Sequence, residues 1–392
     1  MSRRIPRNVY LLGLLSLFND VTADMITPLL PAYLAAMGLG AGFLGVMEGL
    51  ANSLSNVTML FSGWMADRTG KNKRLTVLGY GMSVVSRLFL AIPIPAVALA
   101  ARVSDRIGKG IRTAPRDRLL TASVEKKYWG EAFGVQRAMD HAGSLVGPAI
   151  AAWLLAAFEL KLSTLFLVAC VPSVLSLLLI PRGIQETRDS REKSDASLSW
   201  KKLPPSMKRY VGVIFIAALS TPSELFLLMR MKDLGMEDYQ TPLAWLLMTL
   251  MTLLSAYAGG VLADRWSRRR TIALGWALFA AVYAAFAFTR RLDAAWVLLA
   301  AYGLHMGLVE SAERAYPSRV SDPSIRGTAL GWYYFAYGMG LLPASVAFGF
   351  VWKAWGAEPA FLMSAVLTLV AIFLLAFVPS DRLINIPKKE EG

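Results

Sequence analysis

The chain has 392 residues, of which 55% are hydrophobic and 17% are charged, and its mean hydropathy is +0.47. Soluble domains carry roughly 25% charged residues, so this composition excludes an ordinary soluble protein and indicates one that crosses a membrane several times. The formal net charge of +14 would suit nucleic acid, but the basic residues are spread over many short segments along the chain. We therefore expect a lipid bilayer, and no nucleic acid, around this protein.

Twelve predominantly apolar segments follow one another along the chain. A helix that crosses a bilayer needs about 20 such residues, and each segment approaches or exceeds that length. The segments cover 9–36, 42–66, 74–94, 95–120, 131–157, 162–181, 210–232, 241–263, 271–289, 294–317, 327–351 and 358–379. They predict an all-α membrane protein with twelve transmembrane helices.

Lysine and arginine are distributed unevenly between the two sets of connecting loops. If the N-terminus is cytoplasmic, the cytoplasmic loops and tails hold most of the 41 basic residues. The loops of the opposite side hold only Lys161, Lys232, Arg290, Arg291 and Lys353. This positive-inside pattern predicts a multi-pass protein of the inner (cytoplasmic) membrane with both termini in the cytoplasm. The first apolar run lacks a small-residue cleavage pattern and is expected to be a span.

The two halves of the chain repeat a short motif. Residues 63–74 read Gly-Trp-Met-Ala-Asp-Arg-Thr-Gly-Lys-Asn-Lys-Arg, and residues 260–270 read Gly-Val-Leu-Ala-Asp-Arg-Trp-Ser-Arg-Arg-Arg. The second copy follows the first after 197 residues, about half the chain. A glycine–proline pattern at 143–148 returns at 338–343, with an offset of 195. The repetition predicts two equivalent helical bundles.

A charged segment separates the two predicted bundles. Residues 182–209 are rich in Arg, Glu, Lys, Asp and Ser and contain Leu-Pro-Pro-Ser near their end. We expect a cytoplasmic linker here. It would join an N-terminal six-helix bundle at 1–181 to a C-terminal six-helix bundle at 210–392.

The repeated motif resembles the signature loop of the major facilitator superfamily. The matching positions are Gly63, Asp67 and Arg68 in the first copy and Gly260, Asp264 and Arg265 in the second. Ser267 stands where glycine is usual in the second copy. The segment 105–117, Asp-Arg-Ile-Gly-Lys-Gly-Ile-Arg-Thr-Ala-Pro-Arg-Asp, also resembles a bacterial permease subgroup of that superfamily. The resemblance implies two pseudo-symmetric six-helix bundles and a role for both Asp-Arg loops as conformational latches.

Members of that superfamily move small molecules by alternating access, so the resemblance implies a secondary active transporter. We expect a small-molecule substrate, coupling to the proton gradient and a monomeric chain. A membrane-embedded enzyme and a receptor are the rival classes. Neither finds support, because the sequence has no catalytic serine or cysteine motif and no sizeable soluble segment. Cys170 is the only cysteine and the two histidines are not spaced as metal ligands, so we expect no metal and no cofactor.

Ionised side chains inside the spans mark the candidate site, because a charge at the centre of a membrane helix costs roughly 2.5–3.5 kcal/mol on insertion scales. In the first span, Asp20 and Asp24 are four residues apart and share a helix face. They suit a proton or a cationic group, or else an ion pair that fixes helix packing. Glu48 and Arg87 are further intramembrane charges for which the sequence assigns no partner.

The fourth span is unusually charged for a membrane helix. It carries Arg102, Asp105, Arg106, Lys109 and Arg112 within eleven residues. Asp105, Lys109 and Arg112 have the spacing of one helix face, which has to line water or meet acids from other helices. The family resemblance implies a functional arginine in this span, and either Arg102 or Arg106 fills that position.

The fifth span adds Arg137, Asp140 and His141, which share one helix face. An imidazole beside a carboxylate titrates in the range that proton coupling uses, although a lone buried histidine is often structural. The run from Gly143 to Pro148 resembles the antiporter motif of the superfamily and favours export by antiport.

The second half offers fewer candidates. Glu224 lies in the seventh span without a local partner. Glu310 and Glu313 lie in the tenth, where Arg314, four residues after Glu310, is positioned to neutralise Glu310. Tyr337 belongs to a tyrosine cluster in the eleventh span that suits either stacking on a substrate or anchoring at the membrane interface.

These residues together predict one polar cavity. Its members would be Asp20, Asp24, Arg106, Lys109, Arg137, Asp140, His141 and Glu224. The cationic excess of the fourth span suits an anionic or chelate-like solute, such as an organic acid or a siderophore. The acids equally suit a cationic drug that is expelled in exchange for protons.

Overall fold

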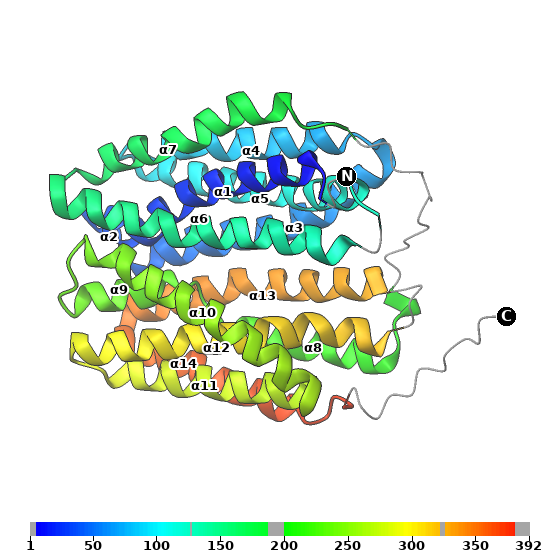
Figure 1. The fold of residues 1–392 in the computed structure, drawn as a ribbon. Helices are drawn as coiled ribbons and strands as arrows, with labels where there is room; N and C mark the ends of the chain where they lie inside the picture. Colours follow the sequence, from blue (N-terminus) through cyan, green and yellow to red (C-terminus); the bar gives the residue numbers. More distant parts are fainter. Residues whose placement is uncertain (1–4, 126–127, 187–199, 322–325, 381–392) are drawn as a thin grey trace. The chain divides into compact units, whose positions relative to one another are not determined.

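Helices make up nearly all of the computed structural model, which describes residues 5–125, 128–186, 200–321 and 326–380. The side chains of Asp67, Arg68 and Asp264 are among those that lie outside this description. The first helices in chain order are α1 (Arg7–Ile26), η1 (Thr27–Leu29), α2 (Leu30–Ala36), α3 (Ala41–Thr69), α4 (Asn72–Phe89), α5 (Pro95–Ala122), α6 (Trp129–Phe158) and α7 (Leu162–Leu179) (Figure 1).

The chain continues through short 3₁₀ turns into the second set of helices. These are η3 (Ile180–Arg182), η4 (Trp200–Lys202), α8 (Pro205–Leu219), α9 (Leu225–Asp233), α10 (Gln240–Arg265), α11 (Arg268–Phe288), α12 (Leu292–Val320), α13 (Arg326–Trp355) and α14 (Ala357–Leu375). Each of the twelve apolar segments of the sequence coincides with one helix or with a pair of helices that follow each other directly.

Eight of the described helical stretches are long and apolar enough to cross a membrane by length and composition alone. The other predicted spans coincide with α3, α4, α5 and the α8–α9 pair. Its charged residues make α5 too polar to meet these criteria of length and composition. Helices α8 and α9 are too short, with only 15 and 9 residues. Apolar content alone therefore does not identify these helices, which carry much of the polar chemistry described below.

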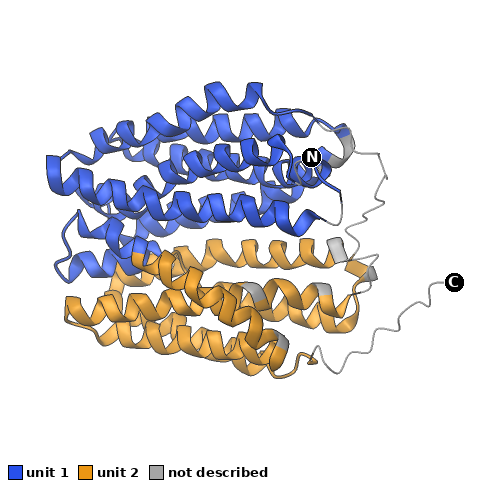
Figure 2. Ribbon diagram, viewed as in Figure 1, with its two compact units in different colours: residues 1–194, 224–246 blue, residues 195–223, 247–392 orange. Residues whose placement is uncertain are grey.

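The helices gather into two compact units (Figure 2). Unit 1 comprises residues 1–194 and 224–246, and unit 2 comprises residues 195–223 and 247–392. Residues 224–246, which the sequence assigns to the C-terminal bundle, cluster with unit 1, where α9 packs on α2. The bounds of the two predicted bundles stay a prediction. The linker expected at 182–209 stays a prediction, because residues 187–199 lie outside the described residues.

Two of the predicted spans are interrupted at Thr-Pro steps. The first changes from α1 to α2 through the turn η1, and the seventh stops at Leu219 and resumes at Leu225. Pro28 and Pro222 lie in these breaks, where proline cannot donate the hydrogen bond that would continue a helix. The two Thr-Pro pairs are 194 residues apart, so the interruption is a further part of the duplication.

Glycines at equivalent positions allow equivalent helix pairs to pack closely in each unit. In unit 1, a Cβ atom at Gly110 on α5 would lie 2.5 Å from the backbone oxygen of Ser55 on α3. In unit 2, a Cβ atom at Gly307 on α12 would collide in the same way with the backbone oxygen of Thr252 on α10. Both members of the pair are displaced by 197 residues. The duplication therefore preserves close backbone contacts that only glycine permits.

Glycines of the glycine–proline repeat also lie at close helix contacts. A Cβ atom at Gly143 on α6 would lie 2.5 Å from the backbone oxygen of Leu17 on α1. A Cβ atom at Gly340 on α13 would lie 2.5 Å from the Cβ atom of Ala218 on α8. The repeat thus coincides with a close α6–α1 contact in unit 1 and a close α13–α8 contact in unit 2.

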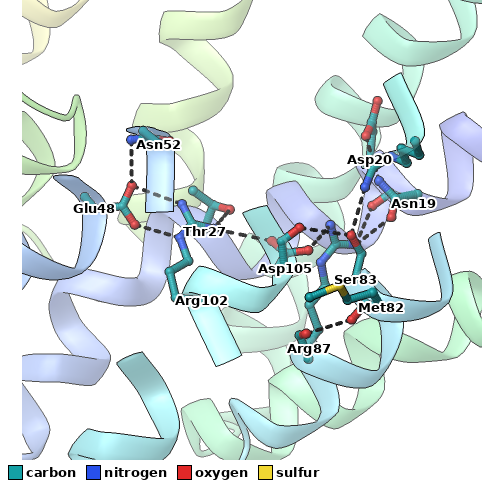
Figure 3. A network of polar contacts seen from close by, with 12 residues as sticks. Asn19, Asp20, Thr27, Glu48, Asn52, Met82, Ser83, Arg87, Arg102 and Asp105 are labelled. Carbon is teal, nitrogen blue, oxygen red and sulfur yellow. Dashed lines mark hydrogen bonds and ion pairs between the residues drawn. The ribbon is translucent and has the colours of Figure 1, made fainter. Parts of the chain in front are cut away.

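A buried ionic network joins α3, α4 and α5 of unit 1 (Figure 3). Arg102 on α5 binds Glu48 on α3 through two contacts, Nε to Oε1 at 2.6 Å and Nη2 to Oε2 at 3.2 Å. Arg87 on α4 pairs with Asp105 on α5 at 2.9 Å, and Arg102 lies 3.8 Å from the same carboxylate. All four side chains are at most 6% exposed. Because two cations face two anions, the network carries no net charge into the membrane interior.

Helix α1 is attached to this network at two points. Arg87 Nη1 donates to the backbone oxygen and to Oδ1 of Asn19, both at 3.0 Å. Arg102 Nη1 donates to Oγ1 of Thr27 at 3.3 Å, at the residue where α1 gives way to η1. Asn19 Nδ2 donates in turn to Oδ1 of Asp20 at 3.0 Å. The network therefore fixes the break in the first span and the position of the first predicted site acid.

Alanine at Gly110 should destabilise the protein, because its Cβ atom would overlap the backbone of Ser55. Overpacking of this kind costs about 1–3 kcal/mol, so we expect a lower melting temperature in detergent. Gly134→Ala on α6 is the matched control, since a Cβ atom there meets nothing within 4 Å. Alanine favours helix over glycine, so this control should melt at the wild-type temperature or slightly above. Equal melting temperatures for the two variants would contradict the close contact.

Glu48→Gln should be strongly destabilising, because it leaves Arg102 buried without its principal counter-charge. Breaking a buried ion pair in this way typically costs about 3–5 kcal/mol. We expect a marked loss of folded protein, measured as monodisperse yield and melting temperature in detergent. Glu131→Gln, at an exposed carboxylate on α6, should have no such effect. The double variant Glu48→Gln/Arg102→Gln should recover part of the lost stability, because it no longer buries an unpaired cation. A double variant that is less stable than Glu48→Gln alone would contradict this explanation.

Candidate functional site

A second group of charged side chains lies beside the network, on α1 and α5 of unit 1. Asp20 and Asp24 follow one face of α1 and are both half-buried. Lys109 and Arg112 act electrostatically on Asp20, and Lys109 and Arg106 act on Asp24. The structure thus brings the predicted acids of the first span together with the predicted bases of the fourth.

Helix α6 adds a further acid to this group. Asp140 acts electrostatically on Asp20, and Arg116 Nη1 lies 3.8 Å from its Oδ2 atom. The side chain of Ser144 lies near Asp24 and acts on its carboxylate. Three carboxylates from two helices therefore face the cations of α5 within one helical bundle.

Two glycines allow this arrangement. A Cβ atom at Gly143 or Gly147 on α6 would collide with the backbone oxygen of Leu17 or Val21 on α1, respectively. The absent side chains let α6 approach α1 closely, which places Ser144 near Asp24. The glycines thus have a packing role that does not depend on the direction of transport.

Of the three charged side chains predicted to share one face of α5, two are buried and one is exposed. Asp105 and Arg112 are buried toward α4, where Arg112 Nη1 donates to Ser83 Oγ at 2.8 Å and the guanidinium lies 4.6 Å from the ring centre of Tyr80. Lys109 on the same helix is exposed. An exposed ammonium in a membrane span requires an aqueous or ionic neighbour, because contact with hydrocarbon is costly.

The two candidate arginines of α5 differ in what holds them. Arg102 is 2% exposed, and its guanidinium is occupied by Glu48, Thr27 and Asp105. The Nε atom of Arg106 is buried and has no hydrogen-bond partner in the described part of the chain. Arg102 therefore has the contacts of a structural residue, and Arg106 has donor capacity left for a ligand.

The other predicted residues of unit 1 lie at different depths. On α6, Arg137 is exposed and His141 is half-buried. Glu224 immediately precedes α9 and acts electrostatically on both Arg102 and Arg106. Glu224 is thereby associated with the charged face of α5, whereas Arg137 is exposed, as Lys109 and Glu310 are.

The predicted residues of unit 2 form no comparable group. Glu310 on α12 is exposed and pairs with Arg314 at 2.8 Å, as their spacing indicated. Tyr337 on α13 is half-buried, and its ring centre lies 6.3 Å from that of Tyr333 in a stacked arrangement. Glu313, one turn from Glu310, is far more enclosed at 6% exposed. The sequence marks it as an acid inside the tenth span but assigns it no role, although it has no basic residue three or four positions away.

The two Asp-Arg loops differ in their backbone. Gly70 has a φ of +64° and ends α3 in the left-handed region, which glycine favours. Its counterpart Ser267 is extended and caps α11, where its hydroxyl accepts a hydrogen bond from the backbone N–H of Arg270 at 3.3 Å. Serine can replace glycine in the second loop because no positive φ is required there.

The latch assigned to these loops stays a prediction. Gly63 lies in α3, and Gly260 and Arg265 lie in α10. The side chains that would act as latches, Asp67, Arg68 and Asp264, lie outside the described residues.

Comparisons with known proteins cover nearly the whole chain and agree with one another. The family model described as Major Facilitator Superfamily matches residues 12–311 and 209–392. An uncharacterised MFS-type transporter of Methanocaldococcus jannaschii is 31% identical over 385 residues, which cover 96% of each chain. The cis,cis-muconate transport protein of Acinetobacter baylyi is 25% identical over 332 residues, 78% of this chain and 76% of that protein.

Solved structures agree on the fold. A bacterial homologue of the human lysosomal transporter Spinster, in an inward-facing and unoccupied conformation, gives a TM-score of 0.78 at 14% identity and 96% coverage of both chains. The nucleoside transporter NupG gives 0.76 at 13% identity, over 94% of this chain and 99% of that one. The protein thus has twelve transmembrane helices in two pseudo-symmetric six-helix bundles. By its fold and by its sequence along its full length, the chain belongs to the major facilitator superfamily of membrane transporters.

Proposed function

We propose that this transporter is driven by the proton gradient and moves a small organic anion or anionic chelate across the cytoplasmic membrane by alternating access. The observation that carries the proposal is the pair of cations on α5. Arg106 has an unused buried donor, and Lys109 is exposed within a membrane span. A guanidinium and an ammonium one helical turn apart offer donors to two anionic oxygens.

The acids opposite these cations supply the proton coupling in this proposal. Asp20 and Asp24 neutralise part of the charge on Lys109 and Arg106 when no substrate is bound. An arriving anion competes with the carboxylates for the same cations. Protonation of Asp20 or Asp24 removes that competition, so the substrate and the proton bind in a linked manner.

A relative supports the choice of an anionic substrate. The cis,cis-muconate transport protein of Acinetobacter baylyi resembles this chain over most of its length. Muconate is a dicarboxylate, and two neighbouring cations match two carboxylates in charge. Organic dicarboxylates are therefore the first compounds to test.

A second candidate function is proton-coupled export of cationic drugs. It is favoured by the three carboxylates Asp20, Asp24 and Asp140, which together present an acidic group on α1 and α6. A cationic substrate would displace Lys109 from these acids instead of displacing the acids from Lys109. The two proposals share one site and differ in which set of charges binds the solute. A monomer with both termini in the cytoplasm is proposed for either case.

Lys109→Gln should weaken anion binding at least tenfold, because one of the two cations of the site is lost. Binding is measured as the rise in melting temperature of the purified protein with cis,cis-muconate, other organic acids, anionic chelates and cationic drugs. Lys161→Gln, at an exposed lysine before α7, is the control and should respond as the wild type does. Stabilisation by cations alone, lost in Asp24→Asn and kept in Lys109→Gln, would favour drug export instead.

Asp24→Asn should uncouple transport from the pH gradient, because the amide can neither bind nor release a proton. In proteoliposomes, we expect substrate exchange without a gradient to persist and the stimulation by an imposed pH gradient to disappear. Asp293→Asn, at an exposed carboxylate before the membrane part of α12, should retain the stimulation. Full stimulation in Asp24→Asn would exclude this residue from coupling, and the absence of flux for every compound would count against the proposal as a whole.

A further inference from the structure

Unit 2 contains one carboxylate that is enclosed by neutral hydrogen-bond donors. Glu313 on α12 is 6% exposed. Its Oε1 atom accepts a hydrogen bond from Trp276 Nε1 on α11 at 2.8 Å, and its Oε2 atom accepts one from the hydroxyl of Tyr333 on α13 at 3.0 Å. The hydroxyl of Tyr210 on α8 donates to the backbone oxygen of Glu313 at 2.9 Å. Four helices therefore meet at this single acid.

The surroundings of Glu313 differ from those of the buried acids in unit 1. No lysine or arginine among the described side chains forms an ion pair with Glu313, whereas Glu48 and Asp105 each bind an arginine. Of the charged groups, Arg314 and Glu310 on the same helix act on it, and these two already pair with each other at 2.8 Å. The packed helices contribute the phenols Tyr210 and Tyr333, which are neutral. An ionised Glu313 would thus keep most of its charge uncompensated in the membrane interior.

The site is too closed for a ligand larger than a proton. Both carboxylate oxygens already have a donor within 3.0 Å, and the side chain is almost fully enclosed. The described residues include no group of three or more His, Cys, Asp or Glu side chains that could hold a metal ion. A solvated cation or an organic ammonium would have to displace Trp276 or Tyr333 from the carboxylate.

The two donors suit both charge states of the acid. Trp276 can only donate, so it holds Oε1 in either state. The hydroxyl of Tyr333 can both donate and accept, so it can turn round and accept a hydrogen bond from a proton on Oε2. Protonation therefore requires only the rotation of one hydroxyl and no movement of a helix.

We infer that Glu313 is a proton-binding site of unit 2, which takes up and releases one proton on Oε2 while Trp276 and Tyr333 hold the carboxyl group in place. Its use as a coupling site in transport rests on the proposed function, but the binding of the proton does not. The chain then has an acid site in each unit, with Asp20 and Asp24 next to cations in unit 1 and Glu313 among neutral donors in unit 2.

Infrared difference spectroscopy of the reconstituted full-length protein tests this directly, because a protonated carboxyl group has its own C=O band. Lowering the pH from alkaline to mildly acidic should produce such bands in the wild type. Glu313→Gln should remove the contribution of one carboxyl group. Glu310→Gln, at the exposed neighbour, should keep the Glu313 contribution. An acid-induced spectrum that is identical in Glu313→Gln and wild type would overturn the inference.

A variant that keeps the acid tests the inference even if Glu313→Gln does not fold. Tyr333→Phe removes the hydrogen bond to Oε2 and should shift the frequency of the Glu313 band, whereas Tyr334→Phe on the same helix should leave it in place. A band that is unmoved by Tyr333→Phe would contradict the assigned geometry. A failure of this inference is distinguishable from a failure of the proposed function. If the band is lost in Glu313→Gln but no substrate is transported, only the proposed function fails. If transport is found but the band does not change, only this inference fails.

Discussion

Charge inside a membrane has to be compensated within the protein, and this constraint governs the structure. Unit 1 meets it with an ionic network in which Arg102 and Arg87 bind Glu48 and Asp105. Because the network contains equal numbers of cations and anions, it can be buried almost completely. It also fixes the break in the first span through Thr27, so the same contacts that neutralise charge position the helix that carries the candidate acids.

Charges left over from this compensation are the ones to which we assign the proposed function. Arg102 and Arg106 are one turn apart on α5, yet the first is fully engaged and the second retains a buried donor without a partner in the described residues. Unit 2 shows the complementary case, in which Glu313 is held by neutral donors only. The family's alternating-access cycle needs groups of this kind, because a side chain locked in a balanced ion pair cannot exchange its partner for a solute or a proton.

The two halves of the chain share their packing and differ in their chemistry. Gly110 and Gly307 make the same close helix contact 197 residues apart. The position of Arg102 is occupied in the second half by Leu299. The duplicated scaffold thus retains the small residues that set helix distances, while among the described side chains the Arg–Glu and Arg–Asp network is found in unit 1. This division explains how a symmetric fold can contain two dissimilar polar centres.

The sequence by itself determined the number of spans, the duplication, the family and the membership of Asp20, Asp24 and Lys109 in a charged group, because hydropathy, repeats and helix spacing are local properties. It did not determine which charges pair. Glu48 is 54 residues from Arg102, and spacing within one helix carries no information about such a contact. Likewise, only the folded unit shows that Glu313 has a tryptophan and a tyrosine from two other helices as neighbours. Partner choice depends on how helices pack side by side, and the tertiary structure alone decides that.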